Sequence, residues 1–182
     1  MTNYIVSGLE RSGTSMMMQI LLHGGMDVAF DEKRRPDENN PKGYFELEGG
    51  KVINRLIEGV FPMDEYDGKV IKVTAYGLKF LPPGDYRIIY MTRELDEIME
   101  SMKKMSGDSK VMEERDIFER LNRYSMKLMK EKGIPHIIVK YNDVLKEPRK
   151  EIERINEFLE GALDVDSAMK AVDPSLYRNR KR

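Results

Sequence analysis

The sequence predicts an α/β fold in which a parallel β-sheet is flanked by helices. Two observations support this: short apolar runs of strand type recur along the chain, and longer segments with helical spacing separate them. Such alternation is typical of parallel sheets with helices on both faces. The 182 residues contain no repeat and no low-complexity linker, so we expect one domain over residues 1–182, ending in a basic tail at 174–182.

Four apolar runs, rich in β-branched and aromatic residues, predict the strands. In chain order they are Tyr4–Val6, Lys69–Val73, Tyr86–Met91 and His136–Lys140. The third follows a Pro-Pro-Gly-Asp turn and is the strongest of the four. In a sheet of this kind, ligands bind at the carboxyl ends of the strands, so the residues that follow each strand are the first candidates for function.

Five segments with apolar residues at helical spacing predict the helices. In chain order they are Thr14–Leu22, about Leu47–Gly59, Asp96–Met105, Met112–Lys132 and Glu147–Leu159. Glycines lie just beyond the first, fourth and last of these, and Pro148 suits the first turn of the last. The polar segment Asp31–Gly43 contains two prolines and is expected to form a loop.

Composition excludes several classes of function. The net charge of −1 provides no overall field to recruit nucleic acid or an anionic membrane. The absence of cysteine excludes disulfides, thiolate metal sites and a cysteine nucleophile. No apolar run is long enough to cross a bilayer, and the first residues lack the layout of a secretory signal. We therefore expect a cytoplasmic protein with neither membrane insertion nor a nucleic-acid partner.

The segment Gly8–Ser15 has the Gly-x4-Gly spacing of a phosphate-binding P-loop between a strand and a helix. Glycines let successive backbone N–H groups point at one anion, and the helix N-terminus adds partial positive charge. Thr14 stands where the P-loop of nucleotide triphosphatases has lysine, which argues against a triphosphate ligand. Arg11 supplies a cation instead. An ordinary glycine-rich turn is the alternative interpretation, and the ordered set of features makes it the weaker one.

The run Ser7–Ser15 resembles the 5′-phosphosulfate-binding loop of the sulfotransferase family, whose members use 3′-phosphoadenosine 5′-phosphosulfate (PAPS). The resemblance implies a P-loop NTPase-like sulfotransferase fold, PAPS as cosubstrate and no metal ion. It also implies that the cosubstrate is bound by Arg11, Ser12, Gly13, Thr14 and Ser15. PAPS carries one phosphate and one sulfate at its 5′ end, so backbone amides and one cation can suffice.

A second motif of the family binds the 3′-phosphate, with an arginine that ends a strand and a serine eight residues later. Arg93 and Ser101 match that spacing after the third predicted strand. Taken singly, each could be an exposed polar residue, but their joint occurrence favours binding. Weaker likenesses cover residues 40–46, 141–145 and 173–178, and the last implies that Arg178 contacts the nucleotide. One departure is Lys72-Val73-Thr74, where many members have Lys-Asp-Pro.

For catalysis, the resemblance implies that Arg11 lies beside the oxygen that bridges phosphate and sulfate. Lys72, at the end of a strand, could act from the opposite side, or it could be a surface lysine. Glu46 is the candidate general base, and it could equally be a solvated loop acid. The rivals of Glu46 are Asp31, Glu32 and Glu48. Of the two histidines, His23 closes a helix and His136 opens a strand, so neither is expected at the site.

These observations predict a sulfotransferase that moves the sulfuryl group of PAPS to a hydroxyl or amine of a small-molecule or glycan acceptor. Two other functions remain open from the sequence. One is a nucleotide or small-molecule kinase with a degenerate P-loop. Thr14, in place of the P-loop lysine, argues against this function. The other is a catalytically silent nucleotide-binding module, which the uncertain identity of the base leaves possible.

Overall fold

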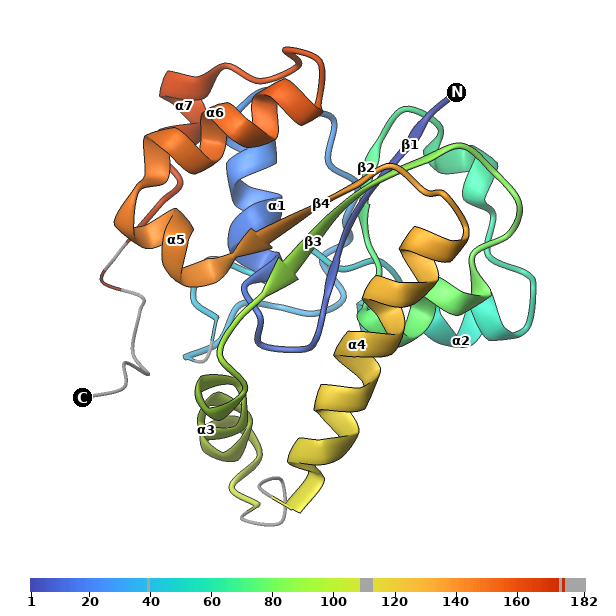
Figure 1. Ribbon diagram of the computed structural model, residues 1–182, viewed down its shortest axis with the longest axis vertical. Coiled ribbons are helices and arrows are strands. Elements are labelled where there is room, and N and C mark those ends of the chain that lie inside the picture. Colours follow the sequence, from blue (N-terminus) through green and yellow to red (C-terminus); the bar gives the residue numbers. More distant parts are fainter. Residues whose placement is uncertain (39, 109–112, 174, 176–182) are drawn as a thin grey trace.

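A computed structural model describes residues 1–38, 40–108, 113–173 and 175, and it contains a four-stranded parallel sheet flanked by helices (Figure 1). The strand order is β2-β1-β3-β4, and every pairing is parallel. The strands are β1 (Asn3–Gly8), β2 (Val70–Lys72), β3 (Tyr86–Thr92) and β4 (His136–Lys140). The predicted fold class is therefore confirmed.

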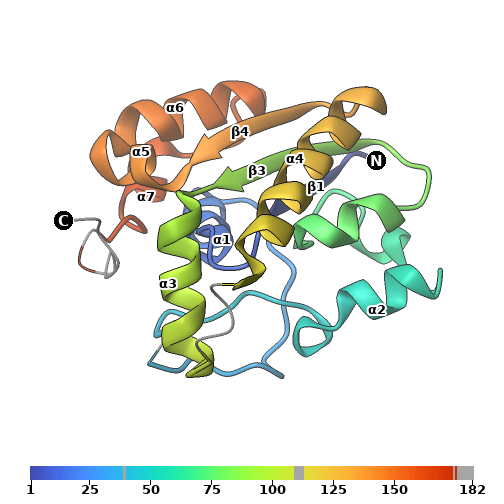
Figure 2. The same ribbon diagram turned by 60° about the horizontal axis from the view of Figure 1, so that its bottom comes forward.

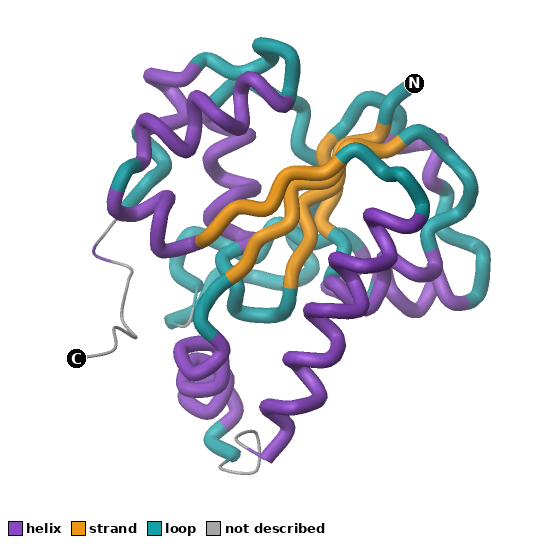
Figure 3. Tube along the Cα trace, viewed as in Figure 1, coloured by secondary structure: helices purple, strands orange, loops and turns teal. Residues whose placement is uncertain are grey.

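Helices cover both faces of the sheet, as the tube drawing makes plain (Figure 3). The α-helices are α1 (Thr14–His23), α2 (Val52–Ile57), α3 (Leu95–Ser106), α4 (Arg115–Glu131), α5 (Tyr141–Lys146), α6 (Pro148–Phe158) and α7 (Val165–Met169). Short 3-10 helices in the described ranges include η1 (Glu48–Gly50), η2 (Met63–Tyr66) and η3 (Ala75–Phe80). Figure 1 shows α1, α5, α6 and α7 on one side of the strands and α2 and α4 on the other, and Figure 2 shows α3 extending away from the end of β3.

Two apolar cores follow from the alternation of side chains along the strands. On one face, Ile5 and Ile88 pack with Leu78 of η3 and with apolar residues of α2, α3 and α4. On the other face, Val6 and Ile89 pack with the apolar residues of α1, α5, α6 and α7. Because strands buried on both faces need apolar residues at nearly every position, the apolar runs in the sequence predicted these strands well.

The helices depart from expectation in the segment predicted as one helix from about Leu47 to Gly59. Gly49 and Gly50 have φ angles of 62° and 89°, which an α-helix does not accommodate, so a 3-10 turn precedes a short α2. Neither η3 nor α7 was expected. The segment at 141–145, which resembles a strand-end segment, forms the helix α5.

The sheet order determines which strand ends lie beside the glycine-rich loop. β1 is central, with β2 on one side and β3 on the other. Val6 pairs with Lys72, and Gly8 pairs with Met91. The loop after β1 therefore lies between the carboxyl end of β2, where Lys72 is, and that of β3, which leads to Arg93. Within the described ranges, no helix has the length and apolar character needed to span a bilayer.

Candidate active site

The loop between β1 and α1 is held in shape by its own backbone. Gly8 has a φ of 147°, and a Cβ atom there would lie 2.5 Å from the carbonyl oxygen of Met91 on the neighbouring strand. Arg11 adopts a left-handed conformation with a φ of 65°. The buried hydroxyl of Ser12 donates a hydrogen bond to the Leu9 carbonyl at 2.7 Å, and the backbone N–H of Ser12 donates to the same oxygen at 3.2 Å. The Ser12 side chain is thus engaged within the loop itself.

The loop leads directly into the N-terminus of α1. Gly13 precedes the helix with a φ of 101°, and no side chain caps this end. The first N–H groups of a helix lack intrahelical acceptors and carry partial positive charge, which suits an anion. A Cβ atom on Gly13 would lie 2.5 Å from the Tyr141 ring, so glycine also allows α5 to approach closely.

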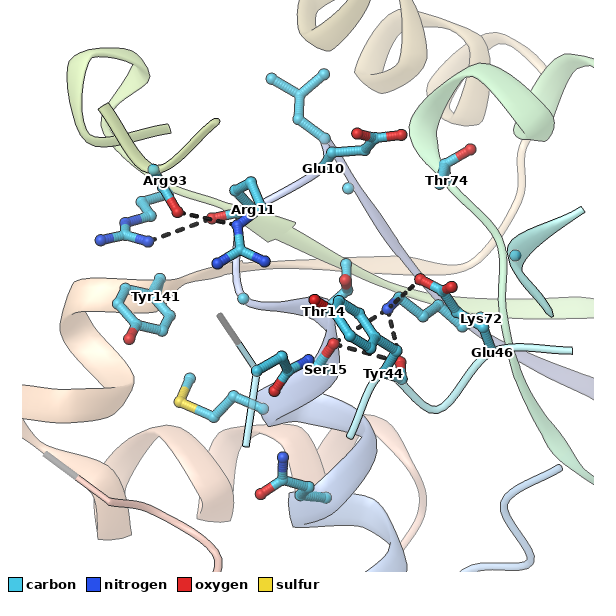
Figure 4. A pocket seen from close by; sticks show the side chains of 18 of the residues that line it. Glu10, Arg11, Thr14, Ser15, Tyr44, Glu46, Lys72, Thr74, Arg93 and Tyr141 are labelled. Carbon is cyan, nitrogen blue, oxygen red and sulfur yellow. Dashed lines mark hydrogen bonds and ion pairs between the residues drawn. The ribbon is translucent and has the colours of Figure 1, made fainter. Parts of the chain in front are cut away.

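On the β3 side of the loop, Arg11 and Arg93 lie close together (Figure 4), and Ser101 lines the same part of the pocket beside Arg11. Arg11 Nε donates to Ser101 Oγ at 2.9 Å, and Arg93 Nη1 donates to the Arg11 carbonyl at 3.3 Å. Arg93 also forms an ion pair with Glu97, with 2.8 Å between Nε and Oε2 and side-chain exposures of only 7% and 4%. The Arg93 guanidinium lies 4.5 Å from the centre of the Tyr141 ring. The arginine is therefore oriented on two sides.

On the β2 side, Lys72 is the centre of a polar network that Figure 4 shows with dashed lines. Its Nζ donates to Glu46 Oε1 at 3.1 Å, to the Tyr44 carbonyl at 2.8 Å and to Ser15 Oγ at 3.1 Å. Burial lowers the pKa of Lys72 below its ordinary value of 10.5, while the Glu46 carboxylate acts in the opposite direction. These contacts join the start of α1, the end of β2 and the loop that follows α1.

A second cation lies on the far side of Glu46. Arg34 Nη1 donates to Glu46 Oε2 at 2.9 Å, and the guanidinium carbon lies 3.5 Å from the centre of the Tyr44 ring. The Tyr44 hydroxyl donates to the Asp37 carboxylate at 2.8 Å. Each Glu46 carboxylate oxygen thus meets a cation. One wall of the pocket is formed by Arg34, Asn40, Pro41, Tyr44 and Glu46.

The structure gathers most of the predicted site residues around one pocket. The predicted residues that line it are Arg11, Gly13, Thr14, Ser15, Glu46, Lys72, Arg93 and Ser101. Ser12 is not in the lining, and Arg178 lies outside the described residues. The lining also lacks the rival acids Asp31, Glu32 and Glu48 and the two histidines. The functional roles assigned to these residues remain predictions.

Several residues of the site were not found from the sequence. Glu97, in the first turn of α3, is buried against Arg93, and the sequence did not indicate this ion pair. Arg34 was not singled out, because no local motif marks it, and Tyr141 was noted only within the weak likeness at residues 141–145, with no role assigned. Glu10 and Thr74 also line the pocket. Among residues 1–38, 40–108 and 113–173, no three acidic or histidine side chains are grouped so as to hold a metal ion.

The fold and the site together define a transferase of the P-loop-like α/β class, with a glycine-rich loop between cationic side chains at the carboxyl edge of the sheet. The model of the sulfotransferase domain matches residues 1–182, and the chain belongs to this family. The family uses PAPS as its donor, and this protein is accordingly a transferase of sulfuryl groups.

Solved structures share the fold at low sequence identity. The sulfotransferase domain of the Synechococcus PCC 7002 olefin synthase is similar at a TM-score of 0.54 and 15% identity, over 100% of this chain and 89% of that one. Retinol dehydratase, solved with androsterone and the inactive cofactor PAP, is similar at 0.56 and 14%, over 97% and 64%. An unliganded sugar kinase from Janibacter sp. HTCC2649 is similar at 0.50 and 14%, over 94% and 98%. No curated protein matches the sequence significantly.

Proposed function

We propose that this protein transfers the sulfuryl group of PAPS to a hydroxyl or amine acceptor, and that the pocket beside the glycine-rich loop binds both substrates. One observation carries the proposal: the two motifs expected to bind opposite ends of PAPS touch each other. Arg11 contacts Ser101 at 2.9 Å, and Arg93 contacts the Arg11 carbonyl at 3.3 Å. Sites for a 5′ group and a 3′-phosphate therefore lie within reach of a single nucleotide.

The start of α1 supports binding of the 5′ phosphosulfate. Backbone N–H groups of Gly13, Thr14 and Ser15, with the Thr14 and Ser15 hydroxyls, provide donors around the uncapped helix end. Arg11 provides the cation. Ser12 contributes indirectly, since its hydroxyl and N–H shape the loop that presents these donors.

The β3 side supports binding of the 3′-phosphate by Arg93 and Ser101. Glu97 and the Tyr141 ring orient the Arg93 guanidinium before the nucleotide arrives. An oriented cation loses less conformational freedom on binding than a mobile one, so preorganisation favours affinity. Arg178, in the C-terminal segment, remains a candidate for a further contact with the same phosphate.

Sulfuryl transfer, like phosphoryl transfer, depends on positioning and on stabilisation of charge at the leaving oxygen. Arg11 and Lys72 lie on the two sides of the loop and can stabilise that charge together. Glu46 and Ser15 hold the Lys72 ammonium in place. Glu46 is also the base candidate predicted from the sequence.

The acceptor is proposed to be a polar small molecule or a glycan. The wall between Arg34 and Glu46 presents a guanidinium, an amide and a carboxylate to the pocket. Such groups form hydrogen bonds with hydroxyl or amine substituents rather than with a purely apolar molecule. A cytoplasmic location and the absence of a nucleic-acid partner complete the proposal, on the grounds of cysteine content and net charge.

Thermal unfolding with adenosine 3′,5′-bisphosphate, compared with ATP and magnesium, tests the choice of nucleotide. A ligand at about 100 times its Kd stabilises the folded protein by about 2.7 kcal/mol. We expect a clear rise in Tm with the bisphosphate and little change with ATP. A rise in Tm with ATP and none with the bisphosphate would support a kinase instead. The similarity in fold to the sugar kinase makes this alternative worth testing.

Release of adenosine 3′,5′-bisphosphate from PAPS tests for activity in the wild type. A silent nucleotide-binding module would bind the bisphosphate but release none from PAPS. Arg11→Ala provides the matched variant, because it removes a cation of the proposed site and leaves the loop glycines intact. Turnover in the wild type that this change abolishes would exclude the silent module.

A further inference from the structure

Three carboxylates line the pocket in the described part of the chain: Glu10, Glu46 and Asp173. Two of them are already engaged. Asp173 forms an ion pair with Lys42 at 3.2 Å and accepts the Ser175 hydroxyl at 2.6 Å. Glu46 meets Lys72 through one oxygen and Arg34 through the other, at 3.1 and 2.9 Å. Both carboxylate oxygens of Glu46 are thus occupied by cations, and a new contact with an acceptor would have to displace one of them.

Glu10 differs from both. Its side chain is exposed, and it makes no hydrogen bond or ion pair with any described residue. It lies in the glycine-rich loop immediately before Arg11. Its carboxylate can therefore accept a hydrogen bond from a bound acceptor without first breaking a contact within the protein.

The position of Glu10 is on the side of the loop where an acceptor would bind. Glu10 lines the same pocket as Lys72 and Thr74, which lie at and just beyond the end of β2, and in Figure 4 its side chain extends towards Thr74 and away from Arg93. The proposed site for the 3′-phosphate lies across the loop, at Arg93 and Ser101, because β2 and β3 flank β1 on opposite sides. The nucleotide thus leaves the β2 side open for the acceptor.

We propose that Glu10 is the general base of the reaction and that Glu46 is a positioning residue that orients Lys72. This inference rests on the proposed function. In the step, the acceptor oxygen forms a new bond to sulfur while the bond from sulfur to the bridging oxygen breaks. The acceptor proton passes to the Glu10 carboxylate, and the electron pair of the broken bond leaves with adenosine 3′,5′-bisphosphate. Arg11 and Lys72 stabilise that leaving charge.

Solvent exposure suits this role because a base must release its proton after each turnover. Glu10 can transfer the proton to water directly, whereas Glu46 is enclosed between Lys72 and Arg34. A general base typically contributes about 100- to 10,000-fold in rate and must come within hydrogen-bond reach of the acceptor. Because the Glu10 side chain makes no hydrogen bond or ion pair with the described residues, it can rotate about its own bonds to reach a bound acceptor.

The test compares two phenolic acceptors, each supplied with PAPS at mildly alkaline pH. The hydroxyl of 2-naphthol is largely protonated under these conditions and needs a base, whereas 4-nitrophenol is largely ionised and does not. We expect Glu10→Gln to slow transfer to 2-naphthol by at least about 100-fold and to leave transfer to 4-nitrophenol nearly unchanged. If the wild type uses neither phenol, release of sulfate to water is measured instead, and Glu10→Gln should slow it while Glu58→Gln should not, since water also needs a base.

Two further variants and one binding measurement make the result decisive. Glu46→Gln should slow both phenols alike, because it disturbs Lys72 rather than proton removal. Glu58→Gln, an exposed acid at the end of α2, should leave both rates unchanged. Calorimetry should show the same affinity for adenosine 3′,5′-bisphosphate in Glu10→Gln as in the wild type.

Loss of activity on 2-naphthol alone in Glu46→Gln, with Glu10→Gln fully active, would overturn the assignment of the base. A wild type that neither binds the bisphosphate nor releases sulfate from PAPS would overturn the proposed function as well. The binding measurement distinguishes these two failures.

Discussion

The two sides of the glycine-rich loop differ in how far their side chains are ordered before any ligand binds. On the β3 side, Arg93 and Glu97 are paired and almost fully buried, and Ser101 is buried beside them. On the β2 side, Lys72 and Glu46 are also paired and largely buried, but the Arg34 side chain beyond them is 39% exposed, and Glu10 in the loop is exposed. The comparison indicates that the nucleotide half of the pocket is built in advance, whereas the acceptor half has side chains that can still adjust.

The largest effect is expected at the junction of the two sides, at Arg11. Removing a donor that stabilises developing charge typically costs about 100- to 1,000-fold in turnover, and we expect a loss of this size for Arg11→Ala. Steady-state kinetics with PAPS measures it. Arg11→Lys keeps the charge and should recover part of the rate. Equal activity in wild type and Arg11→Ala would show that the charge develops elsewhere.

The next largest effect concerns the buried ion pair on the β3 side. Arg93→Ala leaves the Glu97 carboxylate buried without its arginine, which typically costs about 3–5 kcal/mol of stability. Urea denaturation measures this loss. Arg93→Ala combined with Glu97→Ala should recover much of it, since the unpaired charge is gone. A double variant less stable than Arg93→Ala would contradict this explanation.

A smaller effect, dependent on pH, is expected at Lys72. Burial lowers its pKa, so it loses its charge at a lower pH than an ordinary lysine. If that charge stabilises the leaving group, kcat should fall on the alkaline side before pH 10.5 is reached. The arginine of Lys72→Arg keeps its charge in this pH range, so the decrease in kcat at alkaline pH should be absent in that variant.

The lowered pKa of Lys72 also predicts how the stability of the protein changes with pH. The folded protein holds the Lys72 proton less tightly than the unfolded chain does. The contribution of Lys72 to the free energy of unfolding should therefore increase as pH rises from the lowered pKa to 10.5. Urea denaturation at several pH values checks this, with Lys72→Met as the variant in which the contribution is absent.

The smallest effect is expected on the exposed β2 side, at Arg34. Its ion pair with Glu46 is partly solvated, and such pairs contribute about 1 kcal/mol or less. Arg34→Ala should therefore lower the Tm only slightly, while the KM for the acceptor changes more than that for PAPS. A large loss of stability would show that the acceptor wall is as rigid as the nucleotide side.

The difference between the two sides also explains what the sequence could predict. The loop, Arg93 and Ser101 belong to motifs whose spacing is local, and each follows a strongly apolar strand. The contact between Arg34 and Glu46 depends on how an irregular segment folds back, which no periodic pattern encodes. The ion pair of Glu97 with Arg93 was not predicted, because an acid in the first turn of a helix suits the helix dipole equally well when it is exposed. The helix α5 was missed because Tyr141 directly follows β4 with no turn signal.

The central claim, that Arg11 and Arg93 bind two ends of one nucleotide, is tested most directly by a calorimetric double cycle. Adenosine 3′,5′-bisphosphate and AMP differ only by the 3′-phosphate, and each is titrated into the wild type and Arg93→Ala. We predict that losing this phosphate weakens binding to the wild type by at least about tenfold, or about 1.4 kcal/mol, and weakens binding to Arg93→Ala much less. Equal losses in the two proteins would contradict the claim.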